Sequence, residues 1–347
     1  MMTAEQLWFV NPYQLEVRAQ QLPPLQAGQM RVHSVCSGIS AGTEMLVYRG
    51  QLPSELAVDA TLEGLQMQAN YPLPYGYACV GRVEALGEGV AASWMGQLVF
   101  AFQTHASAFI TTPEQVIKVP EDINPEAAIF LANMETAVNM VLDGQPSLGE
   151  QVVVLGQGIV GLLLTSILRQ YPLAGLYALD GLSERRAASV SLGSHQVLDP
   201  FSEQQLESLK HELQLPLDLS ATVGRGADLV YEVTGSPTAL NLAITLCSYS
   251  GRIVIGSWYG NKLSLLNLGG VAHRNRIKLI SSQVSTIAPE LSGRWDKERR
   301  FQTAWDMIRR LNPESLITHK LPLAEAAQIY RLIDQAPEQV LQAVFIY

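Results

Sequence analysis

The feature that most constrains this chain is a glycine turn between an apolar strand and an apolar helix. Four consecutive apolar residues, 152–155, come first, as expected of a strand buried on both faces of a sheet. Gly156, Gly158 and Gly161 follow at the spacing GxGxxG, and an apolar helical segment continues to Leu168. This order predicts a parallel sheet whose first strand-to-helix turn receives a phosphate group.

Each part of such a turn has its own physical role. The first glycine makes the tight turn, the second lets the backbone approach a pyrophosphate, and the third lets the helix pack close to the strand. The N-terminus of the helix adds free N–H groups and a partial positive charge. The residues expected to bind a dinucleotide here are Gly156, Gln157, Gly158, Ile159, Val160 and Gly161.

A carboxylate follows the next predicted strand, at Asp180, about 20 residues beyond the turn. It is placed to accept hydrogen bonds from the ribose hydroxyls of NAD and would repel the 2′-phosphate of NADP. Arg185 lies just beyond, so use of NADP stays open, and the alternative for Asp180 is a carboxylate that only caps a turn. Thr234 and Gly235 end a later strand on the cofactor side of the sheet. Their alternative is an ordinary strand-to-helix turn, with the glycine present for backbone geometry.

The rest of the chain divides by its pattern of elements. Residues 1 to about 120 contain short β-branched segments between Gly and Pro residues, which is typical of β-strands. From residue 151, strands alternate with helices, which predicts an α/β domain with a doubly wound parallel sheet. We expect a β-rich domain at 1–122 and 263–347, and a dinucleotide-binding domain at 123–262. The strands predicted in the second domain are 152–155, 176–179, 196–198, 229–233 and 252–256.

Composition and charge limit the classes of partner. The formal net charge is -9 at pH 7, and there is no run of Lys or Arg, so nucleic acid and membrane surfaces are not expected partners. The first ten residues lack the pattern of a signal peptide. Cys36, Cys79 and Cys247 are far apart, which favours reduced thiols in the cytoplasm over a disulfide framework. A small-molecule substrate fits these limits.

Several segments resemble the medium-chain dehydrogenase/reductase superfamily. They are 38–44 (Gly-Ile-Ser-Ala-Gly-Thr-Glu), 76–83 (Gly-Tyr-Ala-Cys-Val-Gly-Arg-Val), the glycine turn and 226–228 (Gly-Ala-Asp), and the resemblance covers nearly the whole chain. It implies a GroES-like β domain, an inserted Rossmann domain and a C-terminal return to the first domain. It also implies hydride transfer between a nicotinamide and a secondary alcohol or ketone, and it adds Thr136 as a hydroxyl on the cofactor side.

The zinc ligands of that superfamily are not matched. The cysteine position falls on Ser40 or Ala41, depending on the anchor, and the Gly-His-Glu pattern places Tyr77 and Ala78 at its last two positions. The third ligand position falls near residues 132–134 (Ala-Asn-Met). A catalytic zinc needs a thiolate and imidazole set that these residues do not supply. The resemblance therefore implies a zinc-free enzyme.

Within the superfamily, residues 37–44, 48–53 and 316–319 resemble bacteriochlorophyllide a dehydrogenase, which oxidises a hydroxyethyl group on a tetrapyrrole. These short segments leave the substrate open. Two further functions also stay open. One is a reductase of enones or quinones, although the Asp180 carboxylate argues against the NADPH that such enzymes usually take. The other is a dinucleotide-binding protein without catalysis.

Without zinc, hydrogen-bond donors or a proton relay must handle the charge on the carbonyl oxygen. Thr43 matches the hydroxyl that relays the alcohol proton in zinc members, and its alternative is a turn threonine. Tyr77 could donate to an oxyanion, or its ring could fill the space of the metal. Glu44 matches an acid beside the zinc, and its alternative is a salt bridge that orders the loop. His105 is a further candidate because histidine is the residue type suited to proton transfer near neutral pH, and its alternative is a solvated loop histidine.

A homodimer is also expected. The apolar strand 252–256 and the pair Trp258-Tyr259 are predicted near the edge of the sheet, where an aromatic surface invites pairing with a second chain. The alternative is that Trp258 and Tyr259 cover the nicotinamide pocket within one subunit.

Overall fold

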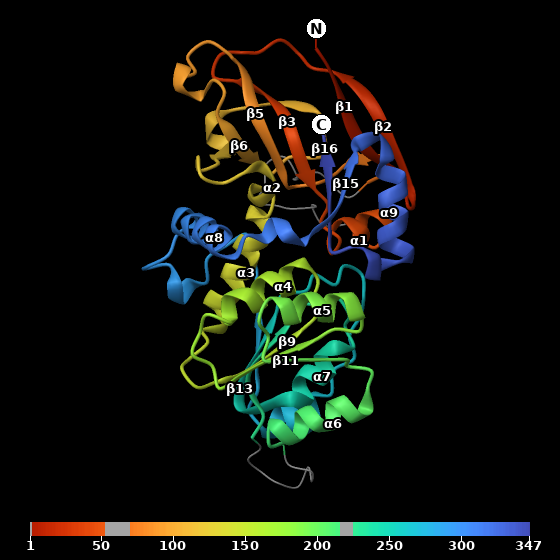
Figure 1. Cartoon of the computed structure of the whole chain (residues 1–347), viewed down its shortest axis with the longest axis vertical. Coiled ribbons are helices and arrows are strands. Elements are labelled where there is room, and N and C mark those ends of the chain that lie inside the picture. Colours follow the sequence, from red (N-terminus) through yellow and green to blue (C-terminus); the bar gives the residue numbers. More distant parts are fainter. Residues whose placement is uncertain (1, 53–69, 216–224) are drawn as a thin grey trace. The chain divides into compact units, whose positions relative to one another are not determined.

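The computed structural model describes residues 2–52, 70–215 and 225–347, and the chain folds as two units. Unit 1 comprises Met1–Ala132 and Ile308–Tyr347, and unit 2 comprises Asn133–Met307. Figure 1 follows the chain from red at the N-terminus to blue at the C-terminus. The predicted α/β class is confirmed, with mostly antiparallel β-structure in unit 1 and a parallel sheet in unit 2. Pro53, the last residue of the segment 48–53, lies outside the described residues.

In the described part of unit 2, six strands form one parallel sheet in the order β11–β10–β9–β12–β13–β14. The order reverses beside β9, and a crevice for a ligand is expected at that point, outside the carboxyl ends of the strands. Every strand predicted between residues 152 and 256 overlaps one of these. Their bounds are β9 (Gln151–Leu155), β10 (Gly175–Leu179), β11 (Gln196–Leu198), β12 (Ala227–Glu232), β13 (Cys247–Ile255) and β14 (Lys278–Ser281).

Helices cover both faces of this sheet. On one face, apolar side chains of the strands form a core with those of α6 and α7, among them Val230 and Leu209. Tyr231, the next residue of β12, points to the opposite face and lies against Gly144 of α3, where a side chain would collide with its ring. The helices are α3 (Leu131–Gly144), α4 (Ile159–Leu168), α5 (Ser183–Ser191), α6 (Glu203–Glu212), α7 (Ala239–Leu246) and α8 (Lys297–Leu311) (Figure 1).

A buried arginine ties the later part of unit 2 to its first helix. The side chain of Arg300 on α8 is fully buried. It donates to the Glu135 carboxylate at 2.7 and 2.9 Å and to the Asn139 side chain at 2.6 Å, both on α3. It also donates to the carbonyls of Val284 and Thr286. One guanidinium thus joins two helices and the loop after β14, and a buried charge of this kind is stable because every donor has a partner.

The structure moves the predicted domain boundaries. Residues 263–307 belong to unit 2, because β14 extends the parallel sheet and Arg300 fastens the loop that follows it. Residues 123–132 belong to unit 1. The predicted sheet edge is also corrected: β13, which contains 252–255, pairs with β14, and β14 is the last strand of the described sheet.

Within the described residues, unit 1 has a three-stranded sheet in the order β2–β1–β4 and a seven-stranded sheet in the order β15–β16–β3–β5–β6–β8, with β7 paired to β3. Strand β16 lies antiparallel beside β3, so the C-terminal segment returns to the first domain as predicted (Figure 1). The strands are β1 (Thr3–Asn11), β2 (Gln14–Gln21), β3 (Met30–Gly38), β4 (Leu73–Pro74), β5 (Cys79–Leu86), β6 (Leu98–Ala101), β7 (Ala108–Thr111), β8 (Val116–Lys118), β15 (Ile317–Pro322) and β16 (Gln342–Ile346). The helices are α1 (Glu44–Tyr48), α2 (Pro125–Ala128) and α9 (Ala326–Gln335).

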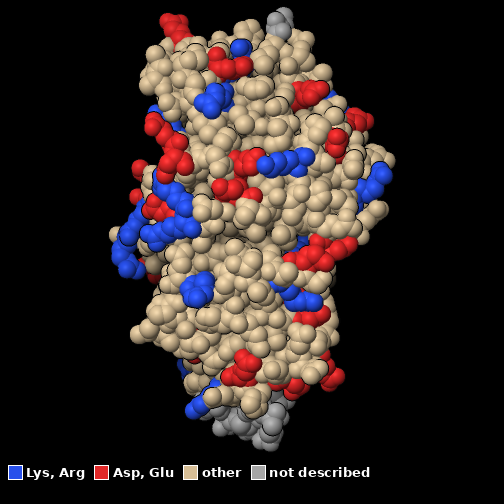
Figure 2. Space-filling model, viewed as in Figure 1, with Lys and Arg blue, Asp and Glu red and all other residues tan. Residues whose placement is uncertain are grey.

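Charges of both signs are spread over the face that Figure 2 shows, and basic side chains gather over α8. Arg294, Lys297 and Arg299, at or just before the start of α8, are exposed. The central guanidinium carbon of Arg299 lies 4.2 Å from the centroid of the Trp295 ring. In the ranges 2–52, 70–215 and 225–347, no helix is both long and apolar enough to span a membrane.

Candidate active site

The glycine turn of unit 2 has the close contacts that its sequence demands. Gly156 has φ +96°, and a Cβ there would lie 2.8 Å from the carbonyl of Val233. A Cβ on Gly161 would lie 2.0 Å from the carbonyl oxygen of Gly156, so only glycine lets α4 pack this close to the strand. Gly158 differs, because the nearest atom to its Cβ position is a nitrogen of Arg185, 3.9 Å away. The space beside Gly158 is open to a ligand.

Asp180 lies directly against this turn. One carboxylate oxygen accepts the backbone N–H of Gln157 at 2.7 Å, and the other accepts that of Leu182 at 2.8 Å. The turn-capping alternative for Asp180 therefore holds in part. It does not use up the carboxylate, because each oxygen has a second lone pair that can accept a ribose hydroxyl.

The side chain of Gln157 supports the turn from within. It is fully buried, donates to the carbonyl of Gly156 at 2.9 Å and accepts from the hydroxyl of Thr165 at 3.2 Å. Ile159 and Val160 are half-buried in the first turn of α4, where backbone N–H groups have no acceptor within the helix. Gln157 thus fixes the turn, and the backbone N–H groups of Ile159 and Val160 are available to donate to a phosphate.

Two arginines of α5 flank Asp180. A terminal nitrogen of Arg185 lies 3.9 Å from the Asp180 carboxylate, and its Nε is buried without a hydrogen-bond partner among the described residues. Arg186 donates to the backbone carbonyl of Asp180 at 2.8 Å and lies 3.4 Å from Asp199. Arg186 is therefore occupied by the protein, whereas Arg185 keeps donor capacity at the edge of the turn.

The end of β12 forms the other wall of the turn. The Cα atom of Thr234 lies 2.9 Å from the position that a Cβ on Gly156 would take. Gly235, at φ +71°, donates its N–H to the hydroxyl of Ser257 at 2.8 Å. Thr136, the remaining residue predicted on the cofactor side, lies on α3 and is half-buried. The structure thus brings Thr234 against the glycine turn.

These groups fit a nicotinamide dinucleotide. Gly158 leaves room for a pyrophosphate over the N-terminus of α4, and Asp180 offers acceptors to the adenosine ribose. The sheet order places Asp180 on the β10 side of the reversal and Thr234 on the β12 side. The two halves of a dinucleotide lie across such a reversal.

Unit 1 brings two predicted residues together in a buried pair. His105 is fully buried, so the alternative of a solvated loop histidine is wrong. Its Nε2 lies 2.9 Å from the Glu44 carboxylate, and its Nδ1 lies 2.7 Å from the hydroxyl of Ser37. Glu44 also accepts the backbone N–H of Ser40 at 2.7 Å and the hydroxyl of Tyr330. This matches the alternative in which Glu44 orders its loop.

A cluster of hydroxyls lies beside that pair. Tyr77 donates its hydroxyl to the Ser40 side chain and is also hydrogen-bonded to Thr43. Burial raises the pKa of Tyr77, and the hydrogen bonds to Ser40 and Thr43 oppose the rise. The phenol therefore keeps its proton at neutral pH. Its ring packs edge-on to Tyr75, so Tyr77 both fills space and presents a donor.

Ser40, Tyr77 and Thr43 are hereafter called the hydroxyl cluster, and this cluster does not fit a catalytic zinc. Its groups are neutral alcohols and a phenol, whereas zinc takes thiolates, imidazoles and carboxylates. The nearby Glu44 carboxylate is already held by three donors. The thiol of Cys36 lies 3.5 Å from the carbonyl of Pro125, and burial raises its pKa, so it stays protonated. In the part of the chain that the structure describes, no three His, Cys, Asp or Glu side chains are grouped to hold a metal ion.

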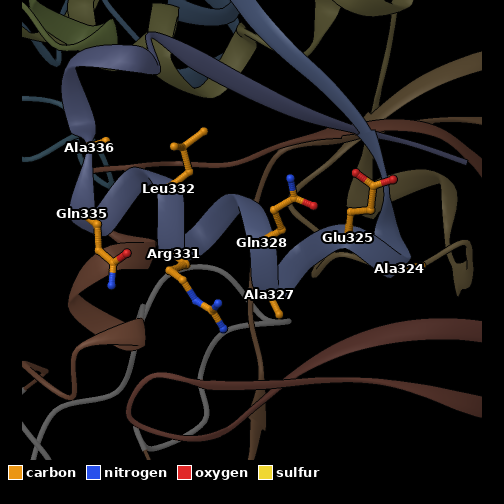
Figure 3. A pocket seen from close by; sticks show the side chains of 8 residues that line it. All are labelled: Ala324, Glu325, Ala327, Gln328, Arg331, Leu332, Gln335 and Ala336. Atoms are coloured by element: carbon orange, nitrogen blue, oxygen red, sulfur yellow. The ribbon is translucent and has the colours of Figure 1, made fainter.

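A separate hollow of about 660 Å³ runs along α9 in unit 1 (Figure 3). None of its lining residues was predicted as a site residue, and none belongs to the hydroxyl cluster. They are Ala324, Glu325, Ala327, Gln328, Arg331, Leu332, Gln335 and Ala336.

Comparisons with known proteins point to dehydrogenases. A family model described as zinc-binding dehydrogenase matches residues 160–308. The starvation-sensing protein RspB of Escherichia coli K12 is 23% identical, over 94% of each chain. An L-threonine 3-dehydrogenase of Caldanaerobacter subterraneus is 25% identical, over 73% of this chain and 77% of its own. These matches show that the chain is similar to dehydrogenases of the medium-chain dehydrogenase/reductase superfamily.

Solved structures agree on the fold of this superfamily. An alcohol dehydrogenase (rspB) of Escherichia coli CFT073, complexed with NADH, has a TM-score of 0.78 at 20% identity, over 99% of both chains. A 2R,3R-butanediol dehydrogenase of Bacillus subtilis has a TM-score of 0.79 at 17% identity, also over 99% of both chains. The chain thus has the two-domain fold of these dehydrogenases.

The carboxylate of Asp180 generates the first prediction. NADH should bind more tightly than NADPH, because a 2′-phosphate would meet the buried negative charge. Asp180→Asn removes that charge and keeps one oxygen acceptor for the backbone. The difference in Kd between the two cofactors, measured by fluorescence titration, should then shrink about tenfold, or ~1.4 kcal/mol. A native preference for NADPH of about tenfold would contradict the ribose assignment.

Proposed function

We propose that this chain is a zinc-independent oxidoreductase that transfers a hydride between NAD and a secondary alcohol or ketone. NADP stays possible as a weaker cofactor. The observation that carries the proposal is the hydroxyl cluster, in which Ser40 and Tyr77 occupy positions that the family resemblance assigns to zinc ligands and Thr43 the position of the relaying hydroxyl. Relatives named as threonine and butanediol dehydrogenases support an alcohol as the substrate class.

The protein's residues would supply binding and proton handling. When bound, the dinucleotide exchanges a hydride with the carbinol carbon. Gly158 and the N-terminus of α4 would hold its pyrophosphate, and Asp180 its adenosine ribose. Tyr77 or Thr43 would donate a hydrogen bond to the substrate oxygen as negative charge develops there. In the oxidative direction the alcohol proton would leave along the same hydroxyls, and Thr43 is partly exposed to solvent.

Glu44 and His105 would act as positioning residues. The carboxylate holds the backbone of Ser40 from one side and is held in turn by His105 and Tyr330. These contacts fix the start of the loop that carries Thr43. A hydroxyl donor stabilises a transition state well only when its position is set in advance.

The hydroxyl cluster generates a prediction about turnover. Tyr77→Phe keeps the ring and removes the donor, so kcat for the alcohol or ketone that reacts best in a broad panel should fall about 10²-fold. Binding of NADH should change little. Tyr13→Phe, on an exposed tyrosine, is the matched control. A kcat for Tyr77→Phe within twofold of the native value would remove Tyr77 from the mechanism.

The same panel separates the other functions. It should contain alcohols, ketones, enones and quinones, with reduction and oxidation both followed at 340 nm. Turnover of enones alone would replace the proposal by an enone or quinone reductase. NADH binding without turnover of any member would indicate a dinucleotide-binding protein that has lost catalysis.

A further prediction concerns the metal. Purified protein should contain less than one zinc per chain by elemental analysis, and incubation with a chelator should leave its activity intact. The reason is that the side chains of Ser40, Ala41, Tyr77 and Ala78 include neither a thiolate nor an imidazole. The nearby imidazole of His105 is bonded to Glu44 and Ser37 through its two nitrogens. One tightly bound zinc per chain, removed together with the activity, would overturn this alignment.

We also propose that the protein is a homodimer. The reason is that two leucines of unit 2 are exposed although hydrogen bonds fix the backbone of the segment that carries them. The side chains of Leu263 and Leu265 are 94% and 92% exposed. Their backbone is fixed, since the side chain of Asn241 donates to the carbonyl of Leu265 at 2.8 Å and accepts the N–H of Asn267 at 3.0 Å. Apolar side chains held in water in this way are typical of a protein interface. A second copy is the simplest partner, since a two-fold axis covers both patches at once.

The dimer has a direct test. Light scattering at low micromolar concentration should give about twice the chain mass of 37.9 kDa. The double variant Leu263→Lys and Leu265→Lys should give a monomer, because lysine disfavours burial of this patch. Phe201→Lys is the control, on a side chain that is 86% exposed elsewhere in unit 2. A native monomer under these conditions would exclude the dimer.

The remaining proposals concern the location of the protein in the cell and its binding partners. We propose a cytoplasmic enzyme that acts on a small molecule and has no nucleic acid or membrane partner. The support is the acidic net charge and the three cysteines, which are free and buried.

A further inference from the structure

A fully buried carboxylate ends the central strand β12, at Glu232. It lies in register with Leu155 of β9 and Ile255 of β13, so its neighbours across the sheet are apolar. Removing a carboxylate from water is costly unless donors replace the water. The hydrogen-bond donors around Glu232 therefore show which parts of the chain its carboxylate connects.

Glu232 binds the two turns that follow β12 and β13. One of its oxygens accepts both the N–H of Thr234, at 2.8 Å, and the Thr234 hydroxyl. The other accepts the hydroxyl of Tyr259. Burial and the neighbouring Glu232 carboxylate raise the pKa of Tyr259, so the phenol remains a donor. A second link runs from the N–H of Gly235 to the hydroxyl of Ser257 at 2.8 Å.

This clamp, defined by Glu232, Thr234 and Tyr259, lies beside the dinucleotide turn. The Cα atom of Thr234 comes within 2.9 Å of the Cβ position of Gly156. Asp180, on the β10 side, would take the adenosine ribose. The sheet order then sends the other half of the dinucleotide over the ends of β12 and β13, which are the two ends that the clamp joins.

We propose that Glu232 and Tyr259 are positioning residues for the nicotinamide half of the dinucleotide. They fix the turn at Thr234 and Gly235 against the turn after β13, so that both turns are in place before the cofactor arrives. Neither side chain has to touch the ligand, because both act through the turn. The inference rests on the proposed function, since it requires a bound nicotinamide dinucleotide.

The test compares two ligands that share the adenosine half. NADH and ADP-ribose are titrated into the native protein, Glu232→Gln and Tyr259→Phe by calorimetry. Each variant should weaken NADH about tenfold and leave ADP-ribose within about twofold. In Glu232→Gln, the carboxamide oxygen can still accept hydrogen bonds from Thr234, but the NH₂ group faces the hydroxyl of Tyr259. Tyr259→Phe removes only the hydroxyl that donates to Glu232.

Tyr231→Phe is the matched control. It lies next to Glu232 on the same strand, and its buried hydroxyl has no hydrogen-bond partner within the described residues. It should bind both ligands as the native protein does. If Glu232→Gln fails to fold, Tyr259→Phe and Thr234→Val still report on the clamp.

The possible results are distinct. Equal weakening of NADH and ADP-ribose would show a general structural role and overturn the proposal, and so would unchanged NADH binding. A native protein that binds neither ligand would remove the proposed function, and the clamp with it. A native protein that binds both, with variants that lose affinity for NADH alone, would support both.

Discussion

The contact between Gly161 and Gly156 is the constraint on which unit 2 depends. A single added carbon on Gly161 would lie 2.0 Å from a backbone oxygen, so the helix and the strand can approach this closely only through glycine. The approach directs the N-terminus of α4 at the turn and brings the turn against Val233 and Thr234. The open space beside Gly158, the Asp180 carboxylate and the second wall of the turn are all arranged around this contact.

Buried carboxylates organise the rest of the molecule. Glu44, Glu135 and Glu232 are each removed from water, and each is held by donors from elsewhere in the chain. The donors differ among the three. Arg300 links Glu135 to a second helix, His105 and Tyr330 bind Glu44 and order its loop, and Tyr259 links Glu232 to a second turn. In all three cases a negative charge has been buried where separate segments must keep a fixed relation, because breaking such a contact leaves an unpaired buried charge.

The sequence predicted the parallel sheet closely because its signal is local. The apolar run at 152–155 and the glycine spacing each fit within a few residues, and the observed strand begins one residue earlier. The structure departs from expectation where partners are distant. His105 was predicted as a candidate catalytic residue with a solvated loop histidine as the alternative, and its burial against Ser37 and Glu44 could not be seen from the sequence. The domain boundary at 263 failed for the same reason, since β14 is short and Arg300 bonds to a helix far back in the sequence. A single glutamate within the apolar segment 229–233 could have indicated that Glu232 is buried and bonded to other parts of the chain.

The division of the chain also has a consequence for its synthesis on the ribosome. Unit 2 is one continuous stretch, Asn133–Met307, so all of its strands have emerged before the chain is finished. Unit 1 cannot be completed then, because β3 waits for β16 and the Glu44 carboxylate waits for the hydroxyl of Tyr330. The part of unit 1 that precedes unit 2 therefore reaches its native contacts only after unit 2 has been translated, whereas the domains of a chain generally fold one after another as they emerge. Until β16 has been made, residues 36–38 of β3 lack the partner strand that they have in the native sheet, and an unpaired edge of this kind can pair with another chain.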